Sequence, residues 1–201
     1  MNAGRLIAFE GLDGCGKSTQ LSRLAAHLRA ARCSVVTTRE PSDLPSGARI
    51  REMARSGRAL VPEEELRWFV EDRRAHVAEV IEPALRAGKI VLTDRYYLST
   101  VAYQGARGLD FERILADSEA AFPIPDLVLL LEIDPQLAYE RVHARGAQLE
   151  GVFERRDFLS RVASVFDAIR RPYIERVPGG GEPDQIAAII AARVHDRLGV
   201  G

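Results

Sequence analysis

The chain has 201 residues, of which 46% are hydrophobic and 28% are charged, and its formal net charge is −1. These values are typical of a globular protein with one core and predict a single domain over residues 1–201. The near-neutral charge argues against a broad nucleic-acid surface, and the lack of a long apolar run argues against a signal peptide or a membrane span. We therefore expect a cytoplasmic protein.

The first half of the chain alternates short apolar or β-branched runs with segments of helical periodicity. Strands are predicted at 6–9, 34–38 and 90–93, and helices at 17–31, 48–53 and 62–87. Pro62, followed by three glutamates, marks the start of the long helix, and Gly88 caps its end. Pro41 and Pro45 are expected to keep the segment after the second strand irregular.

The second half repeats the alternation. Helices are predicted at 99–105, 110–120, 135–144, 156–173 and 184–198, a strand at 127–133, a short strand at 174–177, and a polar loop at 145–154. Strands that alternate with helices predict parallel βαβ units and an α/β fold, a three-layer α/β/α sandwich. Ligands bind such sheets at the carboxyl ends of the strands.

One loop lies at such a strand end and matches the phosphate-binding pattern G-x-x-x-x-G-K-[ST]. Its glycines let backbone N–H groups face phosphate oxygens, and the following helix adds its positive dipole end. Lys17 is predicted to contact the transferred phosphate, and Ser18 to ligate Mg²⁺. The residues predicted to bind ATP here are Gly11, Leu12, Asp13, Gly14, Cys15, Gly16, Lys17, Ser18 and Thr19.

Four more residues are relevant to the phosphate-binding loop: Asp94, Arg95, Cys15 and Cys33. Asp94 ends the strand at 90–93, where a carboxylate would hold Mg²⁺ opposite Ser18, and Arg95 beside it could bind a second phosphate. Cys15 and Cys33 are expected to be free thiols in a reducing compartment, because a disulfide between them would pull the loop from its ligand.

Four segments in order resemble the thymidylate kinases, in their bacterial form. Residues 94–105, DRYYLSTVAYQG, are similar to the family's DRY-x-x-S-x-x-AYQG string, and residues 69–73, FVEDR, to its F-x-x-x-R helix. Arg39-Glu40-Pro41 and GLDGCGKSTQ at 11–20 resemble its REP loop and P-loop. The resemblance implies a P-loop kinase fold with a five-stranded parallel sheet and a mobile lid at 141–156. It also implies a homodimer that transfers the γ-phosphate of ATP to dTMP, giving dTDP.

The resemblance also assigns roles in acceptor binding. Arg39 and Arg95 would hold the dTMP phosphate, and Asp13 the 3′-hydroxyl. The remaining acceptor residues would be Phe69, stacked on thymine; Arg73 and Gln104, at the base; Tyr103, beside C2′; and Ser99. Phe69 and Arg73 are four residues apart and so share a helix face.

Two segments depart from the family pattern. Where the family usually has Gly-Gly-Thr after the REP loop, this chain has Ser42-Asp43-Leu44-Pro45, which adds a negative charge. In the lid, Val152 stands where an arginine is common. Arg145 is then the predicted catalytic arginine, ahead of Arg155 and Arg156, while Arg141 is the predicted neighbour of adenine.

Other functions remain open at this stage. A P-loop kinase for another small acceptor, such as a different deoxynucleoside monophosphate or shikimate, would share most of these motifs. A GTPase-like switch would need the guanine-reading string N-K-x-D, which does not occur. A kinase-like protein that has lost rate, because of Val152, would bind ATP normally and turn over almost none.

Overall fold

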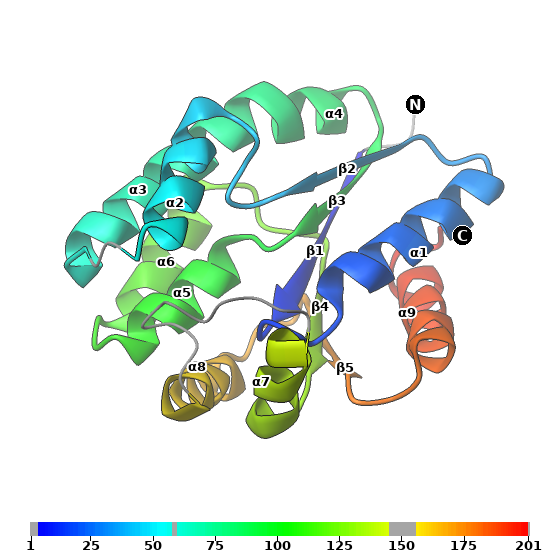
Figure 1. Ribbon diagram of the computed structural model, residues 1–201. Helices are drawn as coiled ribbons and strands as arrows, with labels where there is room; N and C mark the ends of the chain where they lie inside the picture. The colour runs from blue at the N-terminus through cyan, green and yellow to red at the C-terminus, as the bar shows by residue number, and fades with distance from the viewer. Residues whose placement is uncertain (1–3, 58–59, 145–155, 201) are drawn as a thin grey trace.

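Five parallel strands form the centre of the molecule in the computed structural model, which describes residues 4–57, 60–144 and 156–200. The sheet has the order β2-β3-β1-β4-β5 (Figure 1). The strands are β1 (Arg5–Gly11), β2 (Val35–Arg39), β3 (Ile90–Asp94), β4 (Leu127–Glu132) and β5 (Ile174–Pro178). This confirms the predicted α/β class, the five-stranded parallel sheet and the short last strand.

The strand register brings distant residues to one edge of the sheet. Asp94 of β3 lies beside Arg39 of β2 and Phe9 of β1, and Gly11 lies beside Leu131 of β4. The loops that follow these strands therefore start next to one another. This is the edge at which parallel α/β sheets bind ligands.

Helices cover both faces of the sheet (Figure 1). One face carries α1 (Lys17–Ala30) and α9 (Pro183–Leu198), which pack on Ile7 and Phe9 of β1. The other face carries α5 (Tyr97–Ala106), α6 (Phe111–Ala121) and α8 (Arg156–Ala168), which pack with Leu6 and Ala8. Alternate residues of β1 point to opposite faces of the sheet, and both faces are covered by helices. The sequence of the strand is therefore a nearly continuous apolar run.

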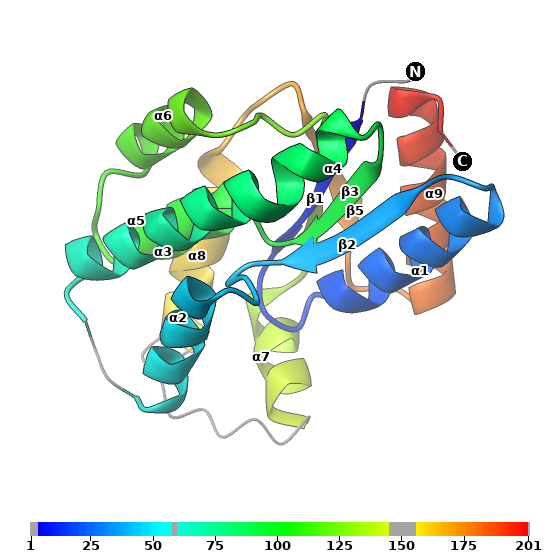
Figure 2. The same ribbon diagram turned by 90° about the horizontal axis from the view of Figure 1, so that it is seen from above.

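The long helix predicted at 62–87 is continuous but not regular. It consists of α3 (Pro62–His76), a π-helical turn η1 (Val77–Ile81) and α4 (Glu82–Arg86), and Gly88 follows with φ of 71°. Pro83 has no N–H to donate one turn back, and the π-helical turn lies directly before it. Figure 2 shows this helix above the sheet, with α2 (Pro45–Arg55) outside it.

Two predicted boundaries were wrong. Pro45 does not keep its segment irregular: it occupies the first turn of α2, where its missing N–H costs nothing. The helix expected to reach residue 173 ends at Ala168, four residues before Pro172, which has no N–H for the Ala168 carbonyl and whose ring would clash with it in a longer helix. At this end the Arg176 guanidinium donates to the carbonyl oxygens of Phe166 (3.0 Å) and Ile169 (3.2 Å). Both corrections follow from the position of a proline, Pro45 in the first turn of α2 and Pro172 just beyond the last turn of α8.

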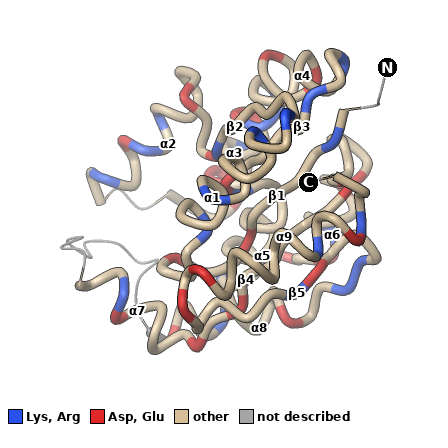
Figure 3. Tube along the Cα trace, turned by 90° about the vertical axis from the view of Figure 1, so that its right-hand side faces the viewer, with Lys and Arg blue, Asp and Glu red and all other residues tan. Residues whose placement is uncertain are grey.

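The remaining helix, α7 (Pro135–Ala144), follows β4 and agrees with its predicted bounds. Both cysteines are free thiols. Across the described residues, every helix is too short or too polar to cross a lipid bilayer. Acidic and basic residues are interspersed along the chain (Figure 3).

Candidate active site

The loop between β1 and α1 has the shape that the phosphate-binding motif predicts. Gly11, Gly14 and Gly16 all have positive φ, and a Cβ on Gly11 would lie 2.4 Å from the carbonyl oxygen of Leu131. A Cβ on Gly14 would lie 2.5 Å from the Ala138 carbonyl oxygen. The loop therefore lies directly against β4 and α7, and only glycine fits at these two positions.

Lys17 begins α1 and is buried inside this loop. Its Nζ donates to the carbonyl oxygens of Leu12 (2.8 Å) and Gly11 (3.1 Å). These contacts hold the ammonium group against the backbone of the phosphate loop. An anion would exchange these two carbonyl partners for a charge-assisted contact.

The two predicted metal ligands are in contact. Ser18 Oγ donates a short hydrogen bond to Asp94 Oδ2 across the edge between α1 and β3. Hydroxyl and carboxylate oxygens are the ligands that Mg²⁺ prefers, and this ion is usually completed by phosphates and waters. Among the described residues there is no group of three or more His, Cys, Asp and Glu arranged to hold a metal. The pair therefore fits a magnesium ion that is bound mainly through a nucleotide.

Arg95 and Asp13 form the centre of the candidate acceptor side. Arg95 Nη2 donates to Asp13 Oδ1 at 2.5 Å, and the Tyr103 hydroxyl donates to Asp13 Oδ2 at 2.9 Å. Burial alone would raise the pKa of Asp13, but the positive charges of Arg95 and Lys17 hold it well below its usual range. Asp13 is thus a permanent anion that orders its neighbours.

The backbone at Arg95 is unusual. Its φ is 71°, a left-handed conformation that residues other than glycine, asparagine and aspartate rarely adopt. The Arg95 N–H donates to the carbonyl oxygen of Phe9 at 2.9 Å, which fixes this turn onto β1. Such conformations concentrate at functional sites, where surrounding contacts hold them.

Glu10 is a buried acid that the sequence analysis did not assign to the site. Its Oε1 accepts from the N–H groups of Tyr96 (2.9 Å) and Ser99 (3.1 Å), and its Oε2 accepts from Ser99 Oγ at 2.5 Å. Burial raises its pKa to about 7. A glutamate inside the apolar run IAFEG was the available signal, because an acid buried in a strand must be bonded to something.

Ser99 is likewise occupied. Its hydroxyl donates to Glu10 and accepts from Arg95 Nη1 at 2.8 Å. Ser99 therefore holds Arg95, and its predicted contact with substrate stays a prediction.

Arg73 lies deep between α3 and α5. Its Nε and Nη2 donate to Glu40 Oε2 at 2.9 and 2.5 Å, and Nη2 also donates to Thr100 Oγ1 at 2.8 Å. His76 Nδ1 is 3.1 Å from Glu40 Oε1. The ion pair is fully buried, and Nη1 of Arg73 has no hydrogen-bond partner among the described residues.

Gln104 lies one turn beyond Thr100 on α5. Gln104 Nε2 donates to Glu65 Oε1 at 2.9 Å. The other amide atom, Gln104 Oε1, is buried and has no hydrogen-bond partner in the described structure. Arg107 also pairs with Glu65 and so holds that carboxylate in place. Phe69, one turn before Arg73 on α3, is half-buried and packs against the small cluster of Ile50, Met53 and Leu60.

The loop after Arg39-Glu40-Pro41 is fixed to α3 by an acid. Asp72 is buried and accepts from the Ser42 N–H (2.8 Å), from Ser42 Oγ (2.5 Å) and from Ser46 Oγ (2.7 Å). A Cβ on Gly47 would lie 2.0 Å from the Ser42 carbonyl oxygen, so loop and helix are in close contact. Ser42, which departs from the family pattern, and Ser46 thus anchor this loop.

Arg39 extends from the end of β2 into this region. It pairs with Asp43 through Nη2 (2.6 Å) and Nε (3.2 Å), and both side chains are largely exposed. The hydrogen bond from Arg39 lowers the pKa of Asp43. The negative charge that the family departure adds, on Asp43, is therefore paired with Arg39, a residue predicted to bind phosphate.

The predicted adenine neighbour lies on the opposite side of the phosphate loop. Arg141 of α7 donates to the carbonyl oxygens of Gly179 (3.1 Å) and Gly180 (3.4 Å) in the loop before α9. Gln20 of α1 donates to the carbonyl oxygen of Pro183 at 2.9 Å and ties the same loop from its other end. Arg145, Arg155 and Val152 lie outside the described residues, and Arg156 begins α8.

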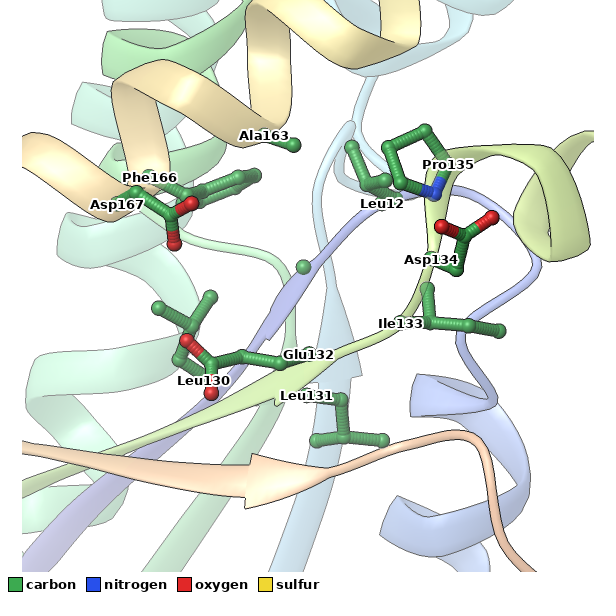
Figure 4. A pocket seen from close by; sticks show the side chains of 11 residues that line it. Leu12, Leu130, Leu131, Glu132, Ile133, Asp134, Pro135, Ala163, Phe166 and Asp167 are labelled. Atoms are coloured by element: carbon green, nitrogen blue, oxygen red, sulfur yellow. The ribbon is translucent and has the colours of Figure 1, made fainter.

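A cavity of about 390 Å³ lies at the carboxyl end of β4, between the phosphate loop, α7 and α8 (Figure 4). Its charged lining is acidic: Glu132, Asp134 and Asp167. Arg176 pairs with Glu132 and Asp167, and Asp134 Oδ1 accepts from the first N–H groups of α7. Such a lining repels phosphate, so we do not assign the nucleotide to this cavity.

Comparison with known proteins shows similarity over nearly the whole chain. The model of the thymidylate kinase family matches residues 9–177. A thymidylate kinase from Desulfotalea psychrophila is 42% identical over 197 residues, covering 98% of this chain and 97% of the relative. Thymidylate kinases from Xanthomonas campestris pv. campestris (strain B100; 41% identical, 98% and 88% covered) and Akkermansia muciniphila (43% identical, 92% and 88% covered) are also similar.

Proposed function

Because the chain belongs to the thymidylate kinase family, we propose that it transfers the γ-phosphate of ATP to dTMP, giving dTDP and ADP. The observation that carries the acceptor assignment is a pair of buried polar atoms that lack partners. Arg73 Nη1 can only donate, and Gln104 Oε1 can only accept. Thymine offers the complementary pattern, an acceptor at O4 and a donor at N3. Cytosine offers a donor and an acceptor in the reverse order, which would leave all four groups unsatisfied.

The rest of the acceptor would be held by the groups around Asp13. Arg95 would bind the dTMP phosphate together with Arg39, and Asp13 would accept from the 3′-hydroxyl. Tyr103, whose hydroxyl is fixed on Asp13, would fill the space beside C2′ and disfavour ribonucleotides. Phe69 would stack on the base from α3. The close arrangement of Arg95, Asp13 and Tyr103 supports this assignment.

On the donor side, the phosphate loop would hold the triphosphate through backbone N–H groups and Lys17. Lys17 would leave the carbonyl oxygens of Leu12 and Gly11 and neutralise the charge that develops on the transferred group. Arg95 would do the same from the acceptor side. No strong base is needed, because the phosphate oxygens of dTMP are already nucleophilic.

We further propose Mg²⁺ as the metal, held by Ser18 and Asp94. When bound, it would supply positive charge that neutralises the phosphates of the nucleotide. The short contact between the Ser18 hydroxyl and the Asp94 carboxylate supports this ligand pair. Arg141 would lie near adenine, and Arg145 in the predicted lid, residues 141–156, would supply a further positive charge.

The single domain over residues 1–201, a homodimer and a cytoplasmic location remain proposals as well. The homodimer rests on the family resemblance. Light scattering of the purified protein tests it: a mass of two chains is expected, and a mass of one chain would contradict it.

The acceptor assignment is tested by measuring ADP release with MgATP and a panel of acceptors. We expect rapid turnover with dTMP, slower turnover with dUMP, and none with UMP, dCMP, dGMP or shikimate. Lys17→Ala should lower kcat by about 10³-fold or more while leaving the circular dichroism spectrum unchanged. Turnover with shikimate or dCMP but not dTMP would overturn the proposal, and wild-type turnover in a folded Lys17→Ala variant would overturn the mechanism.

A further inference from the structure

Glu10 has a structural relation to α5 that the proposed chemistry does not explain. It is the penultimate residue of β1 and its side chain is fully buried. Helix α5 begins after Tyr96, which provides no side-chain cap of its own. The Glu10 carboxylate supplies that cap from another strand, by accepting from the Tyr96 and Ser99 N–H groups. A negative charge at this end of the helix is also favoured by the helix dipole.

A second contact carries the effect of Glu10 toward the acceptor side. Ser99 Oγ has one hydrogen, and it is donated to Glu10 Oε2 at 2.5 Å. A lone pair of the same oxygen therefore faces Arg95 Nη1 at 2.8 Å. The other arm of the guanidinium is held by Asp13 at 2.5 Å. Glu10, Ser99 and Asp13 together fix both ends of the Arg95 fork.

We propose that Glu10 is a positioning residue for the acceptor phosphate, acting on Arg95 through the Ser99 hydroxyl. Glu10 is not placed in contact with the ligand, because both of its carboxylate oxygens already accept hydrogen bonds from Tyr96 and Ser99. The inference rests on the proposed role of Arg95 in binding the dTMP phosphate. The contacts of Glu10 and Ser99 explain why the Arg95 guanidinium has one orientation before dTMP binds. This order in the free protein lowers the entropic cost of binding.

The charge on Glu10 matters for the direction of this relay. The groups that act on its carboxyl are Arg95, the Ser99 hydroxyl and the N–H groups of Tyr96 and Ser99, and it acts in turn on Tyr97. Above pH 7, where it is a carboxylate, Glu10 only accepts, so the Ser99 hydrogen points toward it and away from Arg95. A hydrogen-bond donor at position 10 would turn the Ser99 hydroxyl hydrogen away from residue 10. Ser99 Oγ would then be a weaker acceptor for Arg95 Nη1. Glu10→Gln introduces such a donor with almost no change of shape.

The test measures binding of dTMP and of thymidine, which lacks the phosphate, by calorimetry at about pH 8, where Glu10 is ionised. For Glu10→Gln we expect dTMP to bind about tenfold more weakly, because a hydrogen bond to a charged group is lost. Thymidine affinity and the KM for ATP should change by less than about twofold. Ser99→Ala should weaken dTMP similarly, and adding Glu10→Gln to Ser99→Ala should cause little further loss, because both act on one contact.

Two other variants make the result interpretable. Asp126→Asn is the matched control: Asp126 also accepts a backbone N–H, from Leu6 at 2.8 Å, but at the opposite end of β1. It should leave dTMP affinity unchanged. Glu10→Asp keeps the charge and shortens the side chain, and it replaces Glu10→Gln if that variant does not fold. It should also lose dTMP affinity selectively, by a smaller factor.

The outcomes separate this inference from the proposed role of Arg95. Equal weakening of dTMP and thymidine, or additive effects of Glu10→Gln and Ser99→Ala, would overturn the positioning role. The same conclusion follows if Arg95→Ala weakens dTMP and Glu10→Gln does not. If Arg95→Ala itself leaves dTMP affinity unchanged, then the proposed role of Arg95 fails.

Discussion

Two arginines that are proposed to hold the same phosphate lie in very different surroundings. Arg95, next to the end of β3, is 17% exposed and its fork is held by Ser99 and Asp13. Arg39, at the end of the neighbouring strand β2, is 57% exposed and pairs mainly with Asp43, which is itself 75% exposed. The strand register places both arginines at one edge of the sheet.

The difference indicates two ways of presenting a cation. The contacts of Arg95 are made on folding, and they remain available when a ligand binds, so the residue is organised in advance. The contact of Arg39 is an exposed ion pair, which contributes little and must be exchanged for the phosphate. We therefore expect Arg95 to carry most of the phosphate's binding energy and Arg39 to assist.

The largest effect should come from Arg95→Ala. We expect kcat/KM for dTMP to fall by about 10³-fold, because the arginine is proposed to neutralise charge in the transition state as well as in the bound acceptor. Steady-state kinetics with dTMP varied at saturating MgATP measure this. Arg113→Ala, on the exposed face of α6, is the control and should change nothing. A loss of less than tenfold would remove the contrast between the two arginines.

Glu10, the buried acid linked to Arg95 through Ser99, should also make the free energy of unfolding depend on pH. Burial raises the pKa of Glu10 from 4.5 to about 7, so between these values the folded protein holds a proton that the unfolded chain has released. The free energy of unfolding attributable to Glu10 therefore falls as pH rises from 4.5 to 7, by about 3 kcal/mol. Urea unfolding at several pH values should show this slope in wild type relative to Glu10→Gln.

Asp43→Asn is the control for this pH dependence of the free energy of unfolding, because Asp43 is an exposed acid. Arg39 lowers the pKa of Asp43 from 3.8, so Asp43 is ionised in both states throughout the range from 4.5 to 7. Its unfolding curves should run parallel to those of wild type there. If the Glu10→Gln curves also ran parallel to wild type, Glu10 would not be a buried acid with a raised pKa.

Arg39→Ala should have a smaller effect than Arg95→Ala. We expect the KM for dTMP to rise about tenfold with little change in kcat, because an exposed cation gives up solvation and the Asp43 pair when it binds phosphate. The same steady-state kinetics give both constants. A loss as large as that of Arg95→Ala would show that exposure does not rank the two residues.

Asp43→Asn should have the smallest effect, and of opposite sign. Removing the carboxylate frees Arg39 from its partner and removes a negative charge from the phosphate's path, so the KM for dTMP should fall by about twofold. The change should shrink at high salt. The matched control is Asp117→Asn, which removes an acid from a similarly exposed i,i+4 pair with Arg113. A rise in KM would mean that Asp43 orients Arg39 instead of competing for it.

The parts of the site that could be predicted from the sequence are those fixed by local pattern. The phosphate loop was recognisable because strand, glycines and helix follow one another within about twenty residues. Asp94 could be placed beside Ser18 because Asp94 ends one parallel strand and Ser18 follows the loop at the carboxyl end of another. The helix face shared by Phe69 and Arg73 follows from their spacing of four.

The parts that could not be predicted depend on partners far along the chain. Glu10 caps a helix 86 residues later, and Arg73 is held by Glu40, 33 residues earlier. A buried glutamate in a strand shows that a partner must exist, but only the fold shows which one.

The most direct test of the central claim is the ratio of the dissociation constants of thymidine and dTMP, measured by calorimetry for wild type, Arg95→Ala and Arg39→Ala. This ratio isolates the contribution of the phosphate. The account predicts a large ratio in wild type, a ratio near one in Arg95→Ala, and an intermediate ratio in Arg39→Ala. A ratio that survives in Arg95→Ala but collapses in Arg39→Ala would contradict it, and would make the exposed arginine the main phosphate ligand.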